Sequence, residues 1–194
     1  RWLVEILPEL NQSRASISVG WRGLHRDLVV QTTGFPEPHL QAASAVRGPV
    51  GERLTFKVGD VLGHILDSTH LRADSPEGTL EIACGGAAEC TIDFVPDGSP
   101  FPRIVPIFIH DERHPTRAPL VIPAKLFARP SIPVTTEAGA TARMSIGDRI
   151  YGPETAGSDG RVRFDVRVEP GDREAVVELE DTLGNKQTSA IVIG

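Results

Sequence analysis

The clearest pattern along this chain is a strict alternation of polar and apolar residues in short segments. From residue 161 to residue 169 every second side chain is apolar and the side chains between them are charged. Residues 54–58 and 142–146 alternate in the same way. A helix would need apolar residues three and four positions apart, whereas alternation is typical of a half-buried β-strand. We therefore predict β-strands in these segments.

Turn-forming residues separate the predicted strands. The chain contains 16 Pro and 19 Gly. They gather in clusters such as 97–98, 170–172 and 183–185, where Gly stands beside Asp, Asn or Pro. Short strands bounded by turn residues at regular spacing are the signature of a sandwich of antiparallel strands. The pattern predicts an all-β protein built as a β-sandwich.

Two blocks of the sequence occur twice. Residues 90–122 match residues 160–192 without a gap, with Phe94 falling on Phe164 and Asp111 on Asp181. Residues 51–60 match residues 139–148 at a wider spacing, and we assign the difference to an insertion at 61–78. Repetition at this length predicts tandem modules. We place the first module at 1–123, with extra N-terminal strands and the insertion, and the second at 124–194. The matched inward positions form the predicted core: Ile92, Phe94, Val105, Ile107, Ile109, Val162, Phe164, Ala175, Val177 and Leu179.

Residues 1–34 allow several interpretations. Apolar residues alternate in two stretches, and Pro8 interrupts the first of them. These strands are either the closing half of a preceding module or part of an enlarged first module; a helical stripe over residues 2–10 is the third reading. Pro8 favours strands, because proline disrupts a helix interior. The chain opens at Arg1, so we expect a processed or excised product.

Charge and hydropathy exclude two classes of partner. The net charge is -6, from 20 basic and 26 acidic residues that are interspersed along the chain. Without a cluster of Lys and Arg, we expect no nucleic-acid partner. No apolar run approaches the roughly 18 residues that cross a bilayer, so we expect no membrane span in this segment.

The two cysteines, Cys84 and Cys90, stand where one predicted strand ends and the next begins. A disulfide there would staple a hairpin and contribute about 2 kcal/mol in an oxidising compartment. A pair of buried or free thiols is the alternative. A zinc site would need further Cys or His ligands at suitable spacing.

The turn motifs of the second module carry a family resemblance. They are residues 137–141 before one strand, 159–160 before another, and 181–185 before the last. With these motifs, residues 131–193 resemble a bacterial immunoglobulin-like repeat of the adhesin type. The resemblance implies two tandem immunoglobulin-like β-sandwich modules from an exported bacterial envelope protein, in the periplasm or at the cell surface. It implies a structural, adhesive or protein-interaction role, with other envelope or surface proteins as partners.

Some such repeats bind calcium through acidic turn residues at module junctions. Carried over to this chain, the resemblance nominates Asp159 and Asp181. Calcium takes about six to eight oxygen ligands, and the resemblance names only these two carboxylates. We therefore expect no cofactor, with calcium as the one candidate, and solvated turns as the alternative.

One string resembles a catalytic motif, but it departs from the residues that the motif requires. His110 and His114 have the spacing of a zinc protease motif, but Asp111 stands where that motif needs Glu, and Pro115 follows at once. The repeat places this string on a strand end and a turn instead of a helix. Nucleophile elbows and phosphate-binding loops do not occur in the sequence. We expect no enzyme.

The insertion is the candidate binding segment. His64, Asp67, His70 and Arg72 give it varied polar chemistry, and loops on a rigid sandwich commonly carry binding residues. The alternative function is thus an accessory module that binds a glycan or another ligand through residues 61–78. A glycan platform usually presents aromatic rings, yet only 5% of residues are aromatic. The simpler readings are a solvated loop, or a cap of apolar residues (Val61, Leu62, Ile65 and Leu66) over an open end of the sandwich.

Overall fold

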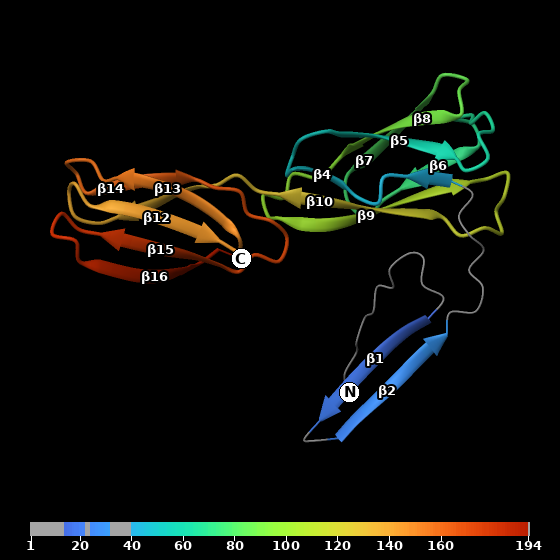
Figure 1. The fold of residues 1–194 in the computed structure, drawn as a ribbon. Coiled ribbons are helices and arrows are strands. Elements are labelled where there is room, and N and C mark those ends of the chain that lie inside the picture. Colours follow the sequence, from blue (N-terminus) through green and yellow to red (C-terminus); the bar gives the residue numbers. More distant parts are fainter. Residues whose placement is uncertain (1–13, 22–23, 32–39, 194) are drawn as a thin grey trace.

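The computed structural model describes residues 14–21, 24–31 and 40–193 (Figure 1). In this part of the chain all regular structure is β, running from β1 to β16, with no helix. The all-β prediction is confirmed. Trp2, Pro8 and the rest of residues 1–13 lie outside the described residues, so the helical interpretation of residues 2–10 is not tested.

The N-terminal strands form a hairpin. β1 (Arg14–Trp21) pairs antiparallel with β2 (Leu24–Gln31) along its whole length, with Arg14 opposite Gln31. The sheet pairings of the described residues join this hairpin to no other strand. Strands were predicted here. Whether they close a preceding module stays a prediction.

Two four-stranded sheets face each other in the first module. One has the order β3-β5-β8-β7 and the other β4-β10-β9-β6. β4 runs parallel to β10, while the neighbouring pairs in both sheets are antiparallel. The strands are β3 (Leu40–Ala42), β4 (Val46–Pro49), β5 (Leu54–Asp60), β6 (Leu71–Asp74), β7 (Thr79–Cys84), β8 (Glu89–Val95), β9 (Arg103–Asp111) and β10 (Leu120–Phe127).

Apolar side chains at alternating positions of the strands fill the core between these sheets. Phe56, Ile92 and Phe94 enter it from one sheet, and Ile107 and Ile122 from the other, all buried in one cluster. Burying each such side chain stabilises the fold by roughly 1.5–3 kcal/mol. The predicted core positions of this module are confirmed, because period-two alternation puts every second side chain on the inner face.

The second module has a smaller sheet opposite a larger one. β11 pairs with β14, and the other four strands have the order β13-β12-β15-β16. Met144, Phe164 and Val177 are buried between the sheets, as predicted for the latter two. Both faces of β16 are largely exposed. The strands are β11 (Ser131–Thr135), β12 (Thr141–Ile146), β13 (Arg149–Thr155), β14 (Arg161–Asp165), β15 (Glu174–Glu180) and β16 (Lys186–Val192).

Strand pairing corrects one of the two sequence repeats. β8 and β9 occupy the same places in the first module as β14 and β15 in the second. The match of 51–60 with 139–148 equates β5 with β12, but β5 pairs with β8 whereas β12 pairs with β15. By pairing, the counterpart of β5 is β11, and the counterpart of β6 is β12. Alternation is common to every half-buried strand, so this match reflected burial and not equivalence.

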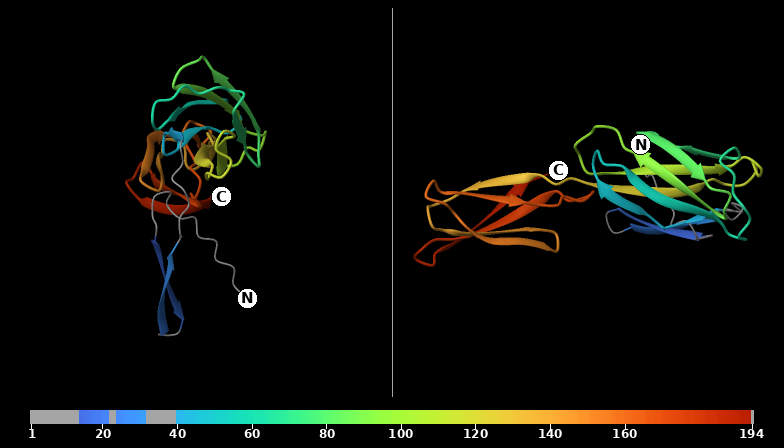
Figure 2. Two further views of the ribbon diagram at one scale, coloured as in Figure 1. Left: turned by 90° about the vertical axis from the view of Figure 1, so that its right-hand side faces the viewer. Right: turned by 90° about the horizontal axis from the view of Figure 1, so that it is seen from above.

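Two boundaries move as a result. The segment 61–78 contains β6, which pairs with β9, so it is not an insertion throughout. The predicted division between 123 and 124 falls inside β10, which stays paired with β9 as far as Leu126. Ala124 and Leu126 are fully buried in the first core, and the change of core follows Phe127. Figure 2 shows the two modules lying end to end.

Candidate functional site

The connection between the modules is itself hydrogen-bonded structure. Ala128 and Val168 exchange two backbone hydrogen bonds of 2.9 and 3.0 Å, and the N–H of Val166 donates to the carbonyl of Pro130 at 3.0 Å. On the other side, Val50 donates to the carbonyl of Phe127 at 2.9 Å. The chain between the modules is therefore tied to both of them.

A cation–π contact between a guanidinium and an aromatic ring also stabilises the junction. The Phe127 ring, buried at the end of β10, is covered by the guanidinium of Arg167 at 3.9 Å from the ring centroid. Arg129 lies over the ring at 5.2 Å. The Tyr151 hydroxyl accepts from the N–H of Arg167 at 3.0 Å and donates to its carbonyl at 3.2 Å. Cation–π contacts contribute about 0.5–2 kcal/mol each, so the relative placement of the modules is held by side chains as well as backbone.

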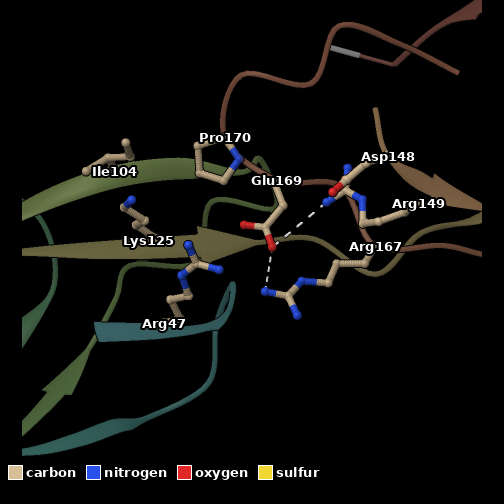
Figure 3. A pocket seen from close by; sticks show the side chains of 8 residues that line it. All are labelled: Arg47, Ile104, Lys125, Asp148, Arg149, Arg167, Glu169 and Pro170. Atoms are coloured by element: carbon tan, nitrogen blue, oxygen red, sulfur yellow. Dashed lines mark ion pairs between the residues drawn. The ribbon is translucent and has the colours of Figure 1, made fainter. Parts of the chain in front are cut away.

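A groove of about 460 Å³ opens beside this contact (Figure 3). Its walls come from both modules, and most of its lining side chains carry charge. The first module contributes Arg47, Ile104 and Lys125, and the second contributes Asp148, Arg149, Arg167, Glu169 and Pro170.

Ion pairs fix the wall of the groove that the second module supplies. Glu169 Oε1 lies 2.5 Å from Arg167 Nη2 and 3.9 Å from Arg149 Nη1. Arg149 also pairs with Asp172 and donates from Nε to the carbonyl of Ile146 at 3.3 Å. Burial acts to lower the pKa of Arg149, but the hydrogen bond and charge of Asp172 outweigh it and hold the pKa above its ordinary value. These guanidinium groups are charged and held in place.

The first module supplies two cations that lie opposite each other on neighbouring strands. Arg47 on β4 and Lys125 on β10 stand directly opposite each other in the parallel register. Ile104 on β9 is opposite Lys125 on the other side, and 54% of it is exposed. Arg47 is exposed and Lys125 is half-buried. Neither has an acidic partner within the described part of the chain.

A second, more apolar pocket of about 270 Å³ lies at the same junction. The β8–β9 loop brings Phe101 and Pro102 to it, and Ile193 lines it from the second module. Arg103 holds this loop by donating to Glu77 at 2.5 Å, to the carbonyls of Ser99 and Phe101, and to Asp97. Phe101 nevertheless remains 72% exposed.

The binding residues predicted at 61–78 each contact a neighbour of their own. His64 Nδ1 lies 3.4 Å from Asp60, His70 Nδ1 lies 3.8 Å from Asp67, and Arg72 pairs with Asp74 at 3.3 Å. Hydrogen bonds from the backbone and side chain of Thr69 lower the pKa of Asp67. The printed contacts of these side chains are thus with residues close by in the sequence, and ligand binding there stays a prediction.

The apolar residues of the same segment behave unequally. Leu66 is fully buried in the first core, whereas Val61, Leu62 and Ile65 are more than half exposed. The backbone N–H of Leu66 donates to Ala87 at 3.0 Å, and Arg113 donates to the carbonyl of Ile65 at 3.4 Å. Of the four apolar residues predicted to cap the sandwich, Leu66 alone therefore contributes to the core.

The two nominated calcium ligands are acceptors in their own turns. Asp159 accepts from the N–H of Arg161 at 3.1 Å. Asp181 accepts from the backbone N–H groups of Leu183 and Asn185 at 2.8 Å and from the Asn185 side chain at 2.7 Å. These bonds, with the Asn185 side chain first, lower the pKa of Asp181. In the described ranges no three His, Cys, Asp or Glu residues gather as a metal site would require, and calcium binding stays a prediction.

The predicted disulfide is confirmed. Cys84 on β7 and Cys90 on β8 are opposite each other in the hairpin and bonded, with Cα atoms 4.4 Å apart. Their placement follows from the strands, because opposed residues in an antiparallel pair bring their Cβ atoms close enough to bridge.

The histidine pair of the rejected zinc motif is split between a strand and a turn. His110 lies on β9, with Nε2 3.1 Å from Asp74, and His114 lies in the turn that follows. Between them Asp111 is buried and paired with Arg113 at 2.7 Å. The side-chain hydrogen bond from Arg113 lowers the pKa of Asp111. The strand and turn predicted for this string are confirmed.

Sequence reasoning missed the junction groove. Arg47 and Lys125 meet only because β4 and β10 pair in parallel, and no local pattern signals a parallel pairing across so many residues. A usable signal was the break in an otherwise apolar row on the outer side of β10, where Lys125 follows Val121 and Pro123.

Comparisons with known proteins found no matching family or curated protein and a weak structural similarity. No protein-family model matches the chain. No curated protein matches it either. Among solved structures, the chain is similar to the adhesin InvE of Yersinia pseudotuberculosis, with a TM-score of 0.35 and 8% sequence identity. The match covers 80% of this chain and 59% of that one. Within the described residues no helix is long and apolar enough to cross a membrane.

Proposed function

We propose that the chain is a non-enzymatic pair of immunoglobulin-like modules that acts as a stiff structural or protein-interaction segment. Its setting is an exported bacterial envelope protein, in the periplasm or at the cell surface, with other envelope or surface proteins as partners. The observation that carries the proposal is the junction, where the connecting residues are hydrogen-bonded to both modules and Arg167 covers Phe127.

Sheet order supports the immunoglobulin-like assignment. If β3 and β4 are taken as one split first strand, one sheet of the first module holds the first, second, fifth and fourth strands, in that order. The other holds the third, sixth and seventh, with the second half of the first strand at its edge. This is the strand distribution of a constant-type immunoglobulin sandwich. In the second module β11 takes the place of β5 and there is no first strand among the described residues. Its fourth strand, β13, differs from β7 because it pairs with β12 in the larger sheet and not with β14.

The setting rests on the disulfide. Disulfides persist in oxidising compartments and are rare in the cytosol. The bond between Cys84 and Cys90 closes an exposed hairpin and therefore favours export. Stiffness suits such a setting, because a chain of fixed module angles holds a distal binding surface away from its anchor.

Backbone ¹⁵N relaxation tests the stiffness. We expect amides of both modules to fit one tumbling tensor for the whole chain. A variant with Gly-Ser-Gly-Ser inserted between Phe127 and Ala128 provides the control, and its modules should tumble separately and faster. Wild-type modules that already tumble independently would refute the proposal.

A second candidate is an accessory module that binds a glycan or another ligand through residues 61–78. The observation that favours it is the exposed group of Val61, Leu62 and Ile65, which stands beside His64. The double variant L62S/I65S leaves buried Leu66 intact, so the fold should survive. Unchanged glycan-array binding by this variant would remove the candidate.

A further inference from the structure

The starting observation is a pair of like charges placed face to face. Arg47 and Lys125 are cross-strand neighbours in the β4–β10 pairing. Like charges directly opposite each other destabilise a sheet. No described carboxylate pairs with either residue. This arrangement costs stability and finds no compensating carboxylate among the described residues, which points to an anionic group from a partner.

The surroundings make this pair part of a larger basic wall. Arg149 and Arg167 face the same groove from the second module, together with the lining carboxylates of Asp148 and Glu169 (Figure 3). Asp172, outside the lining, pairs with Arg149. Glu169 already pairs with Arg167 and Arg149. The chain as a whole carries a net charge of -6, so general basicity does not explain this excess of positive charge.

Preorganisation distinguishes the groove from a scatter of surface charge. Arg167 is stacked on Phe127 and Arg149 is held by Asp172, so their positions are fixed before any ligand arrives. Fixed donors lose less conformational entropy on binding. The groove, at about 460 Å³, also lies within the size range of ligand sites, about 300–1,000 Å³.

We propose that this junction groove binds a carboxylate of an acidic segment of a partner protein, with Arg47 and Lys125 as its direct contacts. The planar guanidinium of Arg47 matches two oxygens of such a group, and the Lys125 ammonium supplies a point charge. Arg149 and Arg167, both held by ion pairs, form the back wall. Exposed Ile104, beside Lys125, offers an apolar contact to the group that carries the anion.

The inference deepens the proposed function, because it names the chemistry of the partner, and it rests on the stiff junction that brings the two walls together. A partner that binds across the groove would contact both modules. Binding and junction geometry are therefore coupled, and the anion should reduce any residual motion between the modules.

The test is an NMR titration of the full chain with citrate, inorganic phosphate and sulfate in separate arms, each at an ionic strength held constant with sodium chloride. We expect saturable shifts at Arg47, Lys125 and Arg167. In R47Q/K125Q the affinity should fall by about tenfold or more, as for the loss of charge-assisted hydrogen bonds. Tightest binding in the citrate arm supports a carboxylate ligand. Tighter binding of phosphate or sulfate would overturn the carboxylate and indicate a different class of ligand.

The matched control is R161Q/R163Q, which removes two exposed cations from the outer face of β14 that do not line the groove. The affinity of this control variant for the anions should stay within about twofold of wild type, because the added sodium chloride screens attraction between distant exposed charges. Non-saturating shifts in all arms, or an equal loss in the control, would overturn the site. Relaxation of the wild-type chain separates the two proposals. Independent tumbling of its modules defeats the stiff segment, whereas a stiff junction without saturable binding defeats the anion site alone.

Discussion

Phe164→Ala is the most informative change to the second module. Its ring is 2% exposed in the core. Ile132 is its cross-strand neighbour, and Gly152 packs so closely that a Cβ there would lie 3.0 Å from the ring. Removing a buried Phe costs about 3–5 kcal/mol through lost burial and the cavity left behind. At about 0.05–0.15 kcal/mol per residue, a module of about 65 residues has about 3–10 kcal/mol of stability in total, so the variant should lose a large share of the stability of the second module.

Urea unfolding followed by amide signals resolves the modules. The free energy of unfolding should fall by about 3–5 kcal/mol for amides of β12 and β14, while amides of β5 and β8 keep most of theirs. Phe94→Ala, the matched change at the equivalent place in the first module, should reverse the pattern. A loss below about 1 kcal/mol in the second module would refute the assignment of Phe164 to a tightly packed core.

Three further changes test local features. Pairing with Arg113 lowers the pKa of Asp111, so this contribution is present above pH 4 and is lost as the pH falls through the folded-state pKa; the stability gap to Asp111→Asn in urea should be about 1–3 kcal/mol at pH 7 and shrink toward pH 2. Replacing Cys84 and Cys90 with Ser should lower stability by about 2 kcal/mol, measured by calorimetry against the oxidised chain, and an unchanged transition would show the bond to be dispensable. Gly160→Ala places a Cβ 2.3 Å from a backbone carbonyl at a φ of +69°, so it should destabilise the second module by more than about 1 kcal/mol; a neutral effect would contradict the turn geometry.

Period-two alternation predicted β5, β12 and β14 and the core positions, because the burial of every second side chain is a local property of a strand. The segment 161–169 was predicted too long, since β14 ends at Asp165. The same property misled the comparison of 51–60 with 139–148, since strands in different sheets share the alternation. Residues 61–78 were read as an insertion although they contain β6, whose four residues are too few for a clear pattern. Pairing, and not alternation, decides which strands are equivalent.

The candidate site depended on contacts that no local pattern reveals. Cys84 and Cys90 were predictable because they close a short hairpin. Arg47 and Lys125 meet through the parallel pairing of β4 with β10, and their groove exists only once Arg167 is brought against Phe127. The turn carboxylates drew attention in the sequence because of their type, yet their hydrogen bonds serve their own turns.

The most direct test of the stiff junction is a distance distribution between spin labels on the two modules. Spin labels attached to noncanonical amino acids, placed at exposed Glu81 on β7 and Thr188 on β16, need no added cysteine and leave the disulfide intact. We expect one narrow peak for the wild-type chain and a broader one for F127A/R167A, which removes the stacked contact. The chain with Gly-Ser-Gly-Ser after Phe127 should give the broadest distribution. A wild-type distribution as broad as that of the linker variant would contradict the account.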